Sequence, residues 1–273
     1  MDALSALLSH AAPKADLFFS GNLCGSSCSE EHPGEGQLHL VRSGELALYE
    51  EGVLRYTISE PTLIVFPKGK KHRLQSLTLE GCDLVCAGLS FKDSPLYRAL
   101  PNAIVVPLSD LPSLSPVITL LFEEAFAERY AQTTVIATLL DLILLLLIRH
   151  LVDTKACQAS VLAALSEPKL AKAIEAIHSQ PDQAWTIETL AQHCGMSRAR
   201  FAALFHQVIG QPPLSYLTES RLLLAQQLLL SGHPIKSVCL DVGYGSSVAF
   251  SRAFQRQFGV TPSKWLQEEE AKE

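Results

Sequence analysis

Residues 243–265 read GYGSSVAFSRAFQRQFGVTPSKW, and this stretch decides the fold of the C-terminal part of the chain. We predict a short helix over Pro234–Gly243, a glycine-containing turn, and a second helix over Val248–Phe258, which Ser247 caps and Gly259 ends. A helix, a turn with glycine and another helix form a helix-turn-helix motif, whose second helix can project into a major groove.

The same pattern occurs earlier in the chain, as LAQHCGMSRARFAALFHQVIGQPPLSYL at residues 190–217. Thr186 is a favourable N-cap for its first helix, and Ser197 for its second. The two second-helix caps, Ser197 and Ser247, lie 50 residues apart, and a long helix is predicted between them over Leu214–Leu230. Two such motifs on one rigid helix could enter successive major grooves, roughly 34 Å apart.

These two stretches resemble the DNA-binding domain of the AraC/XylS regulators over about residues 168–267. The resemblance is specific because both motifs, their separation and the FGVTPSKW ending agree with the family. It implies a transcription regulator that binds double-stranded promoter DNA, with activation and contact with RNA polymerase as the family's usual mode. We place the AraC-type DNA-binding domain at residues 163–267.

The resemblance also assigns residues that contact bases. In the second motif these are Ser247, Val248 and Arg252, and an arginine can read guanine with two hydrogen bonds. The matching positions of the first motif are all alanine, where the family usually has polar residues. Either these alanines contact thymine methyl groups, or the neighbouring arginines make the contacts, including contacts to phosphates. The full predicted set is Arg198, Ala199, Arg200, Ala202, Ala203, Ser247, Val248, Ser251 and Arg252.

The distribution of charge is consistent with this assignment, although the net charge of the chain is −6. Residues 169–264 carry nine Lys and Arg against five Asp and Glu, which is a net charge of +4, whereas residues 1–167 carry −7. The positive field therefore lies where phosphate contacts require it.

The first third of the chain predicts short strands, because apolar and polar residues alternate between Gly, Pro and charged turns. The strands are expected within residues 38–50, 53–59, 62–67 and 82–91. PKGKKH at Pro67–His72 matches the Pro-x-Gly-x-x-His of the second cupin motif, and HLVRSGELALY at residues 39–49 resembles the first. We therefore predict an α+β protein. Residues 1–155 are expected to form a cupin-like β-barrel domain with trailing helices, which serves for sensing and dimerisation. An all-α domain with two helix-turn-helix motifs follows, and residues 95–112 are expected to be irregular.

The cupin resemblance raises the question of a metal, because a working cupin site uses three His and one Glu. The matching positions here are Glu30, His32, Gln37 and His72. This set is depleted, and Gln37 is a poor ligand. We expect no cofactor and no metal, with His32 and His72 as weak candidates for metal ligands. The alternative is that His72 is a turn residue and His32 lies exposed on an acidic loop.

The cysteines are the stronger candidates for a sensor. Seven cysteines without a secretory signal favour a reducing compartment with free or redox-active thiols. Cys24 and Cys28 are four residues apart, as are Cys82 and Cys86, and one antiparallel register would set Cys24 opposite Cys86 and Cys28 opposite Cys82. The basic side chains at residues 68–73 could lower the pKa of a nearby thiol. Cys86 and then Cys24 are therefore expected to contribute most to a response to oxidants.

The stretches MDALSALL, FPKGKKHRL and CAGLSF resemble a subgroup with cysteine-bearing cupins that includes regulators sensing reactive chlorine. We predict that Cys24, Cys28, Cys82 and Cys86 sense oxidants. A zinc site of four cysteines and ordinary core packing are the alternatives.

The most apolar segment, VIATLLDLILLLLIRHL at Val135–Leu151, is too short to cross a bilayer and carries Asp141 near its middle. We expect a helix buried in a core or in a homodimer interface. The opening MDALSALLSHAAPK lacks the basic start and apolar core of a signal peptide. A cytoplasmic protein without a membrane partner is therefore expected.

The combined interpretation is a sequence-specific DNA-binding regulator that its N-terminal domain controls through cysteine oxidation, and not an enzyme. One alternative is a regulator that responds to a small-molecule effector in the cupin pocket, with incidental cysteines. Another is a metal-binding cupin enzyme fused to a DNA-binding domain, which the depleted ligand set disfavours.

Overall fold

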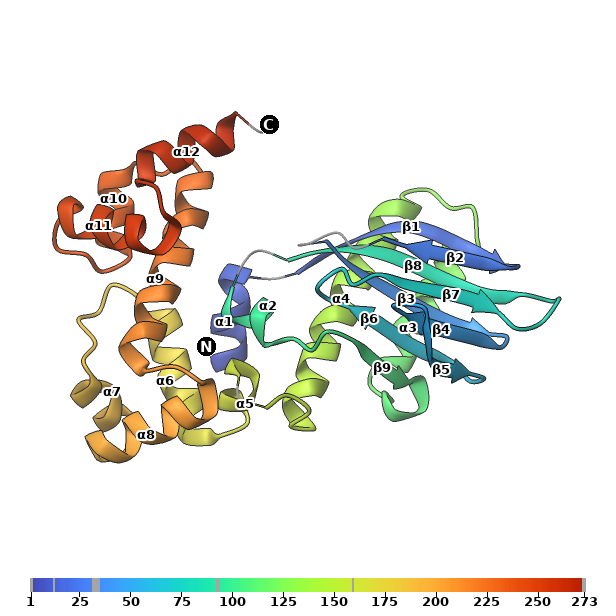
Figure 1. Ribbon diagram of the computed structural model, residues 1–273, viewed down its shortest axis with the longest axis horizontal. Helices are drawn as coiled ribbons and strands as arrows, with labels where there is room; N and C mark the ends of the chain where they lie inside the picture. The colour runs from blue at the N-terminus through green and yellow to red at the C-terminus, as the bar shows by residue number, and fades with distance from the viewer. Residues whose placement is uncertain (1, 12, 31–34, 92–93, 159, 272–273) are drawn as a thin grey trace. The chain divides into compact units, whose positions relative to one another are not determined.

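The computed structural model describes residues 2–11, 13–30, 35–91, 94–158 and 160–271. The chain forms two compact units. Unit 1 comprises residues 1–11, 93–99 and 155–273, and unit 2 comprises residues 12–92 and 100–154. Strands dominate unit 2 and helices make up unit 1, so the predicted α+β class is confirmed (Figure 1).

Unit 2 contains two antiparallel sheets, with strand orders β1-β8-β3-β6-β9 and β2-β7-β4-β5. Its core lies between them and includes Val41 and Phe66 from the first sheet and Leu48 and Leu74 from the second. The strands are β1 Lys14–Leu23, β2 Ser26–Ser29, β3 Glu35–Ser43, β4 Leu46–Glu50, β5 Val53–Ile58, β6 Thr62–Phe66, β7 His72–Ser76, β8 Cys82–Ser90 and β9 Ile104–Pro107.

Four of these strands, β1, β2, β7 and β9, were absent from the sequence prediction. β2 reads SSCS and contains no large apolar residue, so it carries no alternating pattern. The segment expected to be irregular also contains α2 Pro95–Ala99, β9 and the 3-10 turn Leu108–Asp110. Sheet pairing with β6 stabilises β9, and this long-range contact is invisible in a local pattern.

Two helices complete unit 2: α3 Ser115–Ala125 and α4 Gln132–Asp153. The expectation that this segment is too short to cross a membrane is wrong, because α4 has 22 residues and is long and apolar enough. However, α4 packs against α3 and β1 and buries eight of its side chains. The carboxylate of Asp141 accepts hydrogen bonds from Lys14 Nζ at 2.6 Å and from the Ala15 amide at 3.0 Å. Its charge therefore fixes β1 on α4, as expected for a core helix of a folded domain.

Unit 1 carries the two predicted helix-turn-helix motifs, α7–α8 and α10–α11, joined by α9 (Figure 1). Phe201 and Phe205 anchor the first motif in the core, and Phe250 and Phe254 anchor the second. The helices of unit 1 are α1 Ala3–Ala11, α2, α5 Val161–Leu165, α6 Pro168–Ser179, α7 Ile187–His193, α8 Arg198–Ile209, α9 Pro213–Leu230, α10 Ile235–Asp241, α11 Ser247–Phe258 and α12 Pro262–Glu270.

The helix caps follow the sequence signals with one correction. Thr186 caps α7 and Ser197 caps α8, each through its side-chain oxygen. The second motif is capped by Ser246, whose hydroxyl accepts from the Ala249 amide at 3.2 Å, and not by Ser247. With two adjacent serines, composition alone does not determine which of them adopts the extended backbone of an N-cap.

Two short helices from the N-terminal half of the sequence group with unit 1. α1 packs against α6, and α2 packs against α5. Leu7 and Leu96 provide the buried anchors of these two helices. The sequence had placed both segments in a continuous domain over residues 1–155.

Candidate DNA-binding surface and sensor residues

The second motif presents one polar face of α11 to solvent. Phe250 and Phe254 are fully buried, whereas Arg252 is exposed and Val248 is 59% exposed. Ser251 is half-buried beside them. The helix is thus held by its aromatic side, and the residues predicted to contact bases remain available on the other.

The first motif differs in the chemistry of its exposed face. Ala199, Arg200 and Ala203 are exposed on α8, while Ala202 is half-buried. Arg198 forms an ion pair with Glu188 of α7, with 2.8 Å between Nη1 and Oε1. Arg198 therefore also braces α8 against α7, whereas Arg200 extends from the same helix without a described ion-pair partner. All nine predicted residues lie on the second helices of the motifs, and their contacts to DNA remain predictions.

Each motif turns at a glycine in the left-handed region: φ is +63° at Gly195 and +80° at Gly243. The surroundings of the two glycines differ. A Cβ at Gly195 would meet nothing within 4 Å, but one at Gly243 would lie 2.6 Å from Arg221 Nη2 and 2.8 Å from the Pro181 oxygen. Arg221, on α9, is fixed there because it donates to the carbonyl oxygens of Pro181 and Gln183, each at 2.7 Å.

The cysteines of unit 2 do not adopt the predicted pairing, so that register is wrong. In the β1–β8 ladder Phe19 lies opposite Cys86 and Leu23 opposite Cys82. Cys28 belongs to β2 and lies opposite Arg73 of β7. A break at Gly25 separates β1 from β2, and the two strands join different sheets, so Cys24 and Cys28 cannot share one register.

Cys24 instead follows the end of β1, next to the start of β8. A Cβ built on Gly81 would lie 2.8 Å from Cys24 Sγ, which places this thiol over the residue preceding Cys82. The Cys24 thiol is exposed and donates to Asn22 Oδ1 at 3.1 Å, whereas Cys82 is buried and donates to the Glu45 oxygen at 3.1 Å. The fold thus brings an exposed and a buried cysteine to one end of the ladder.

Burial controls the chemistry of the other β8 cysteine. Burial raises the pKa of the Cys86 thiol to about 12, and it also raises the pKa of Cys82. Both groups are therefore protonated near neutral pH, and the thiol form is a weak nucleophile. This disfavours Cys86 as the first residue to react with an oxidant, although it was the residue expected from the sequence to contribute most.

A pair of buried histidines, His39 and His72, lies inside unit 2, and only His72 was a candidate from the sequence. Their Nε2 atoms are 2.8 Å apart, and His72 Nδ1 is 2.8 Å from the Lys70 carbonyl oxygen. Because a carbonyl only accepts, His72 Nδ1 carries the proton and its Nε2 must accept from His39 Nε2. His39 Nδ1 is then a bare lone pair, and it has no partner among the described residues.

Burial, with a smaller effect of His72, lowers the pKa of His39 to about 3, and burial also lowers the pKa of His72. The pair is therefore neutral near pH 7. His39 and Cys86 are neighbours on β3 and β8, and both line a cavity of about 250 Å³ between the two sheets. The remaining walls are mostly apolar and are provided by Phe18, Phe19, Leu23, Ser27, Leu74 and Leu84.

The four positions that match cupin metal ligands do not converge. The Glu30 carboxylate binds Lys71 Nζ at 2.7 Å, and Gln37 Oε1 accepts from Ser29 Oγ at 2.6 Å. His72 is directed at His39, and His32 lies outside the described residues. Within the described part of the chain, no group of three or more His, Cys, Asp or Glu side chains is arranged to hold a metal ion.

Comparisons with known proteins agree with both halves of this architecture. Residues 2–153 match the cupin family, and residues 190–268 match a helix-turn-helix domain family. The RCS-specific HTH-type transcriptional activator RclR of Escherichia coli K12 is 29% identical over 277 residues, which cover 97% of each chain. The HTH-type transcriptional regulator AlkR of Acinetobacter baylyi is 46% identical over 110 residues, which cover 40% of this chain and 36% of AlkR.

Among solved structures, ToxT from Vibrio cholerae O395 aligns over 94% of this chain and 97% of its own, with 15% sequence identity and a TM-score of 0.40.

Proposed function

The chain belongs to the AraC-type DNA-binding transcription regulators with an N-terminal cupin domain, and from this premise we propose that oxidation of cysteines in unit 2 controls its binding to promoter DNA. The observation that carries the proposal is the meeting of exposed Cys24 and buried Cys82 at one end of the β1–β8 ladder. The name of RclR, an RCS-specific activator, supports the same class of signal.

The proposed chemistry has two steps. Hypochlorous acid oxidises the Cys24 thiol to a sulfenic acid and is itself reduced to chloride, with release of a proton. Cys82 then loses its proton, and the resulting thiolate attacks the sulfenic sulfur, so that a disulfide forms and the hydroxyl group leaves with this proton as water. The raised pKa of Cys82 makes this second step the slower one. Gly25, with φ of +104°, lies beside Cys24 and lets the end of β1 adjust to the geometry of the bond.

The direct test is a titration of the purified full chain with hypochlorous acid, followed by promoter-DNA binding and by mass spectrometry of the cysteine peptides. We expect the affinity to change as a Cys24–Cys82 disulfide accumulates, and we expect prior blocking of thiols to prevent both changes. An affinity that oxidation leaves unchanged, or that changes equally after blocking, would contradict the proposal.

A second candidate function rests on the cavity beside His39. The lone pair on His39 Nδ1 and the apolar walls favour a small, largely apolar effector with one hydroxyl or N–H donor. In that case the cysteines would be incidental, and a promoter response would survive their replacement. We propose for either signal that the chain is a cytoplasmic regulator without catalytic activity and that it acts with RNA polymerase.

We also propose that residues 1–155 sense the signal and form a homodimer through α4, and that residues 163–267 bind DNA. Val135 is 36% exposed and Leu142 is 40% exposed on this apolar helix, which supports a further partner for α4. Sedimentation of the full chain at tens of micromolar should show a dimer, and Leu142→Arg should shift it toward monomer. Leu79→Arg, at a turn residue that is 98% exposed, is the matched control and should leave the dimer intact. A monomeric wild-type chain would refute this dimer.

Arg252 provides a test of base recognition. Arg252→Ala is expected to cost about 1–3 kcal/mol of binding free energy and to relax specificity at one base pair, because a bidentate contact to guanine would be lost. Binding of the full chain to a promoter duplex and to its single-base variants measures both effects. An equal loss on every sequence would make Arg252 a phosphate contact instead.

A further inference from the structure

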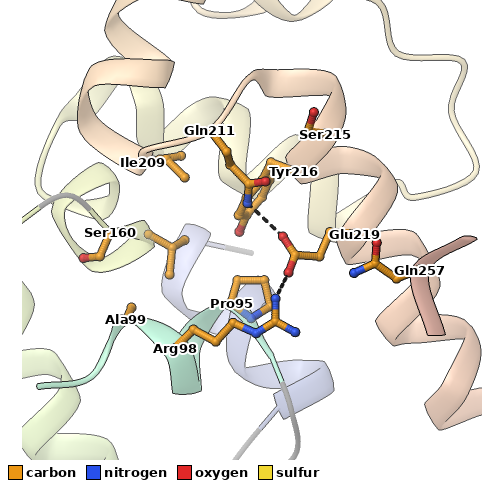
Figure 2. A pocket seen from close by; sticks show the side chains of 11 residues that line it. Pro95, Arg98, Ala99, Ser160, Ile209, Gln211, Ser215, Tyr216, Glu219 and Gln257 are labelled. Atoms are coloured by element: carbon orange, nitrogen blue, oxygen red, sulfur yellow. Dashed lines mark hydrogen bonds and ion pairs between the residues drawn. The ribbon is translucent and has the colours of Figure 1, made fainter. Parts of the chain in front are cut away.

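The short helix α2 contacts the framework that carries both helix-turn-helix motifs. Arg98 of α2 forms an ion pair with Glu219 of α9, the helix that joins the motifs (Figure 2). The same carboxylate accepts a hydrogen bond from Gln211 Nε2 at 2.8 Å. Gln211 lies in the turn between α8 and α9, directly after the first recognition helix. One half-buried carboxylate, 12% exposed, therefore connects α2 to α9 and to the end of α8.

A pocket of about 420 Å³ lies at this point, and its walls show what α2 touches. Pro95 and Arg98 of α2 form one wall, and Tyr216 and Glu219 of α9 lie across from them (Figure 2). The remaining walls include Ile209, the last residue of α8, and Gln257, near the end of α11. α2 is thus placed where the C-terminal ends of both recognition helices meet the connecting helix.

The sequence connects this site to the sensor strands. α2 begins at Pro95, five residues after the end of β8, and α1 ends shortly before β1 begins. β1 and β8 are paired, and Lys14 and Ser90 are the partners at the end of the ladder from which both connections start. The β1–β8 strand pair is therefore joined through the chain to two helices that belong to the DNA-binding unit.

We infer that α2 is a clamp, meaning that it holds the two helix-turn-helix motifs at a fixed separation, and that the Arg98–Glu219 ion pair attaches α2 to α9. Two motifs that bind successive major grooves gain affinity when their spacing is preorganised, because less freedom is lost on binding. Release of the clamp then weakens simultaneous binding of both motifs and leaves each motif's own contacts unchanged. This mechanism does not depend on which signal moves unit 2, so it holds for an oxidant and for an effector.

The test uses the purified, reduced full chain and a duplex that the wild-type protein selects from a random-sequence pool. A second duplex has one of the two half-sites scrambled. Arg98→Gln and Glu219→Gln are each expected to weaken binding to the complete site by about threefold to fivefold, the range of a partly exposed ion pair. Binding to the single half-site should not change, and the exchanged pair R98E/E219R should restore affinity for the complete site.

Glu268→Gln is the matched control, because it removes the exposed Lys264–Glu268 pair of α12 and should have no effect. Wild-type affinity of both single variants for the complete site would overturn the clamp. Equal losses on both duplexes, or failure of R98E/E219R to recover, would overturn it as well. Since no oxidant is present, these outcomes are independent of whether cysteine oxidation is the signal.

Discussion

A chain with Cys24→Ser is expected to lose its response to a sub-lethal pulse of hypochlorous acid, so that promoter output in treated cells stays at the untreated level. Cys24 is the exposed thiol at the end of the β1–β8 ladder, and without it no sulfenic acid forms beside Cys82. Cys82→Ser should also abolish a lasting response, because the sulfenic acid on Cys24 would have no thiol to resolve it. Reporter output from the target promoter, variant by variant, is the measurement.

Cys86→Ala is the informative comparison for Cys24→Ser. The sequence pattern favours Cys86 as the most important thiol, but burial raises its pKa to about 12 and its strand partner is Phe19. We therefore expect most of the response to remain in this variant. Cys239→Ala is the control in unit 1, where the thiol is buried against α9. A full response from the quadruple Cys24/28/82/86→Ser chain would end the redox proposal and leave the effector cavity as the better account.

The sequence predicted features that depend on a few neighbouring residues. The caps at Thr186 and Ser197 are encoded within a single turn of chain, and the structure has them where the sequence places them. The amphipathic pattern of α11 similarly places Phe250 and Phe254 inside and Arg252 outside. Ala249 does not follow this pattern, since helical spacing groups it with the two phenylalanines but it is exposed.

Features that depend on long-range pairing were not predictable in the same way. The β1–β8 register pairs residues that lie 59 (Leu23 and Cys82) to 76 (Lys14 and Ser90) positions apart, and it shifts at a bulge between Leu17 and Phe19. Equal spacing of cysteines therefore does not specify it. His39 was missed because it alternates with Leu38 and Leu40, a position that the simple pattern assigns to an outer face. β3 lies inside its sheet, between β8 and β6, and both of its faces are covered at this point.

Gly195 and Gly243 occupy equivalent turns of the two motifs, but long-range packing gives them different tolerance of a side chain. Gly243→Ala is expected to destabilise unit 1 by about 3–5 kcal/mol, whereas Gly195→Ala should cost about 1–2 kcal/mol, the penalty for a Cβ in the left-handed region. The difference arises because the new Cβ at residue 243 would displace Arg221. One or both hydrogen bonds from this charged side chain, to the Pro181 and Gln183 oxygens, would then be lost, at about 1.5–3 kcal/mol each.

Tryptophan fluorescence isolates this effect, because the two tryptophans of the chain, Trp185 and Trp265, both belong to unit 1. Urea unfolding of the full chain, followed by this signal, should place Gly243→Ala well below Gly195→Ala in midpoint, with the slope unchanged. Arg221→Gln provides the complementary measurement. If Gly243 acts through Arg221, then adding Gly243→Ala to Arg221→Gln should cost far less than it does in the wild type, because the obstructing guanidinium is already gone. Equal destabilisation by the two glycine substitutions would instead show that the turn at Gly243 accommodates a Cβ without displacing Arg221 from the Pro181 and Gln183 oxygens.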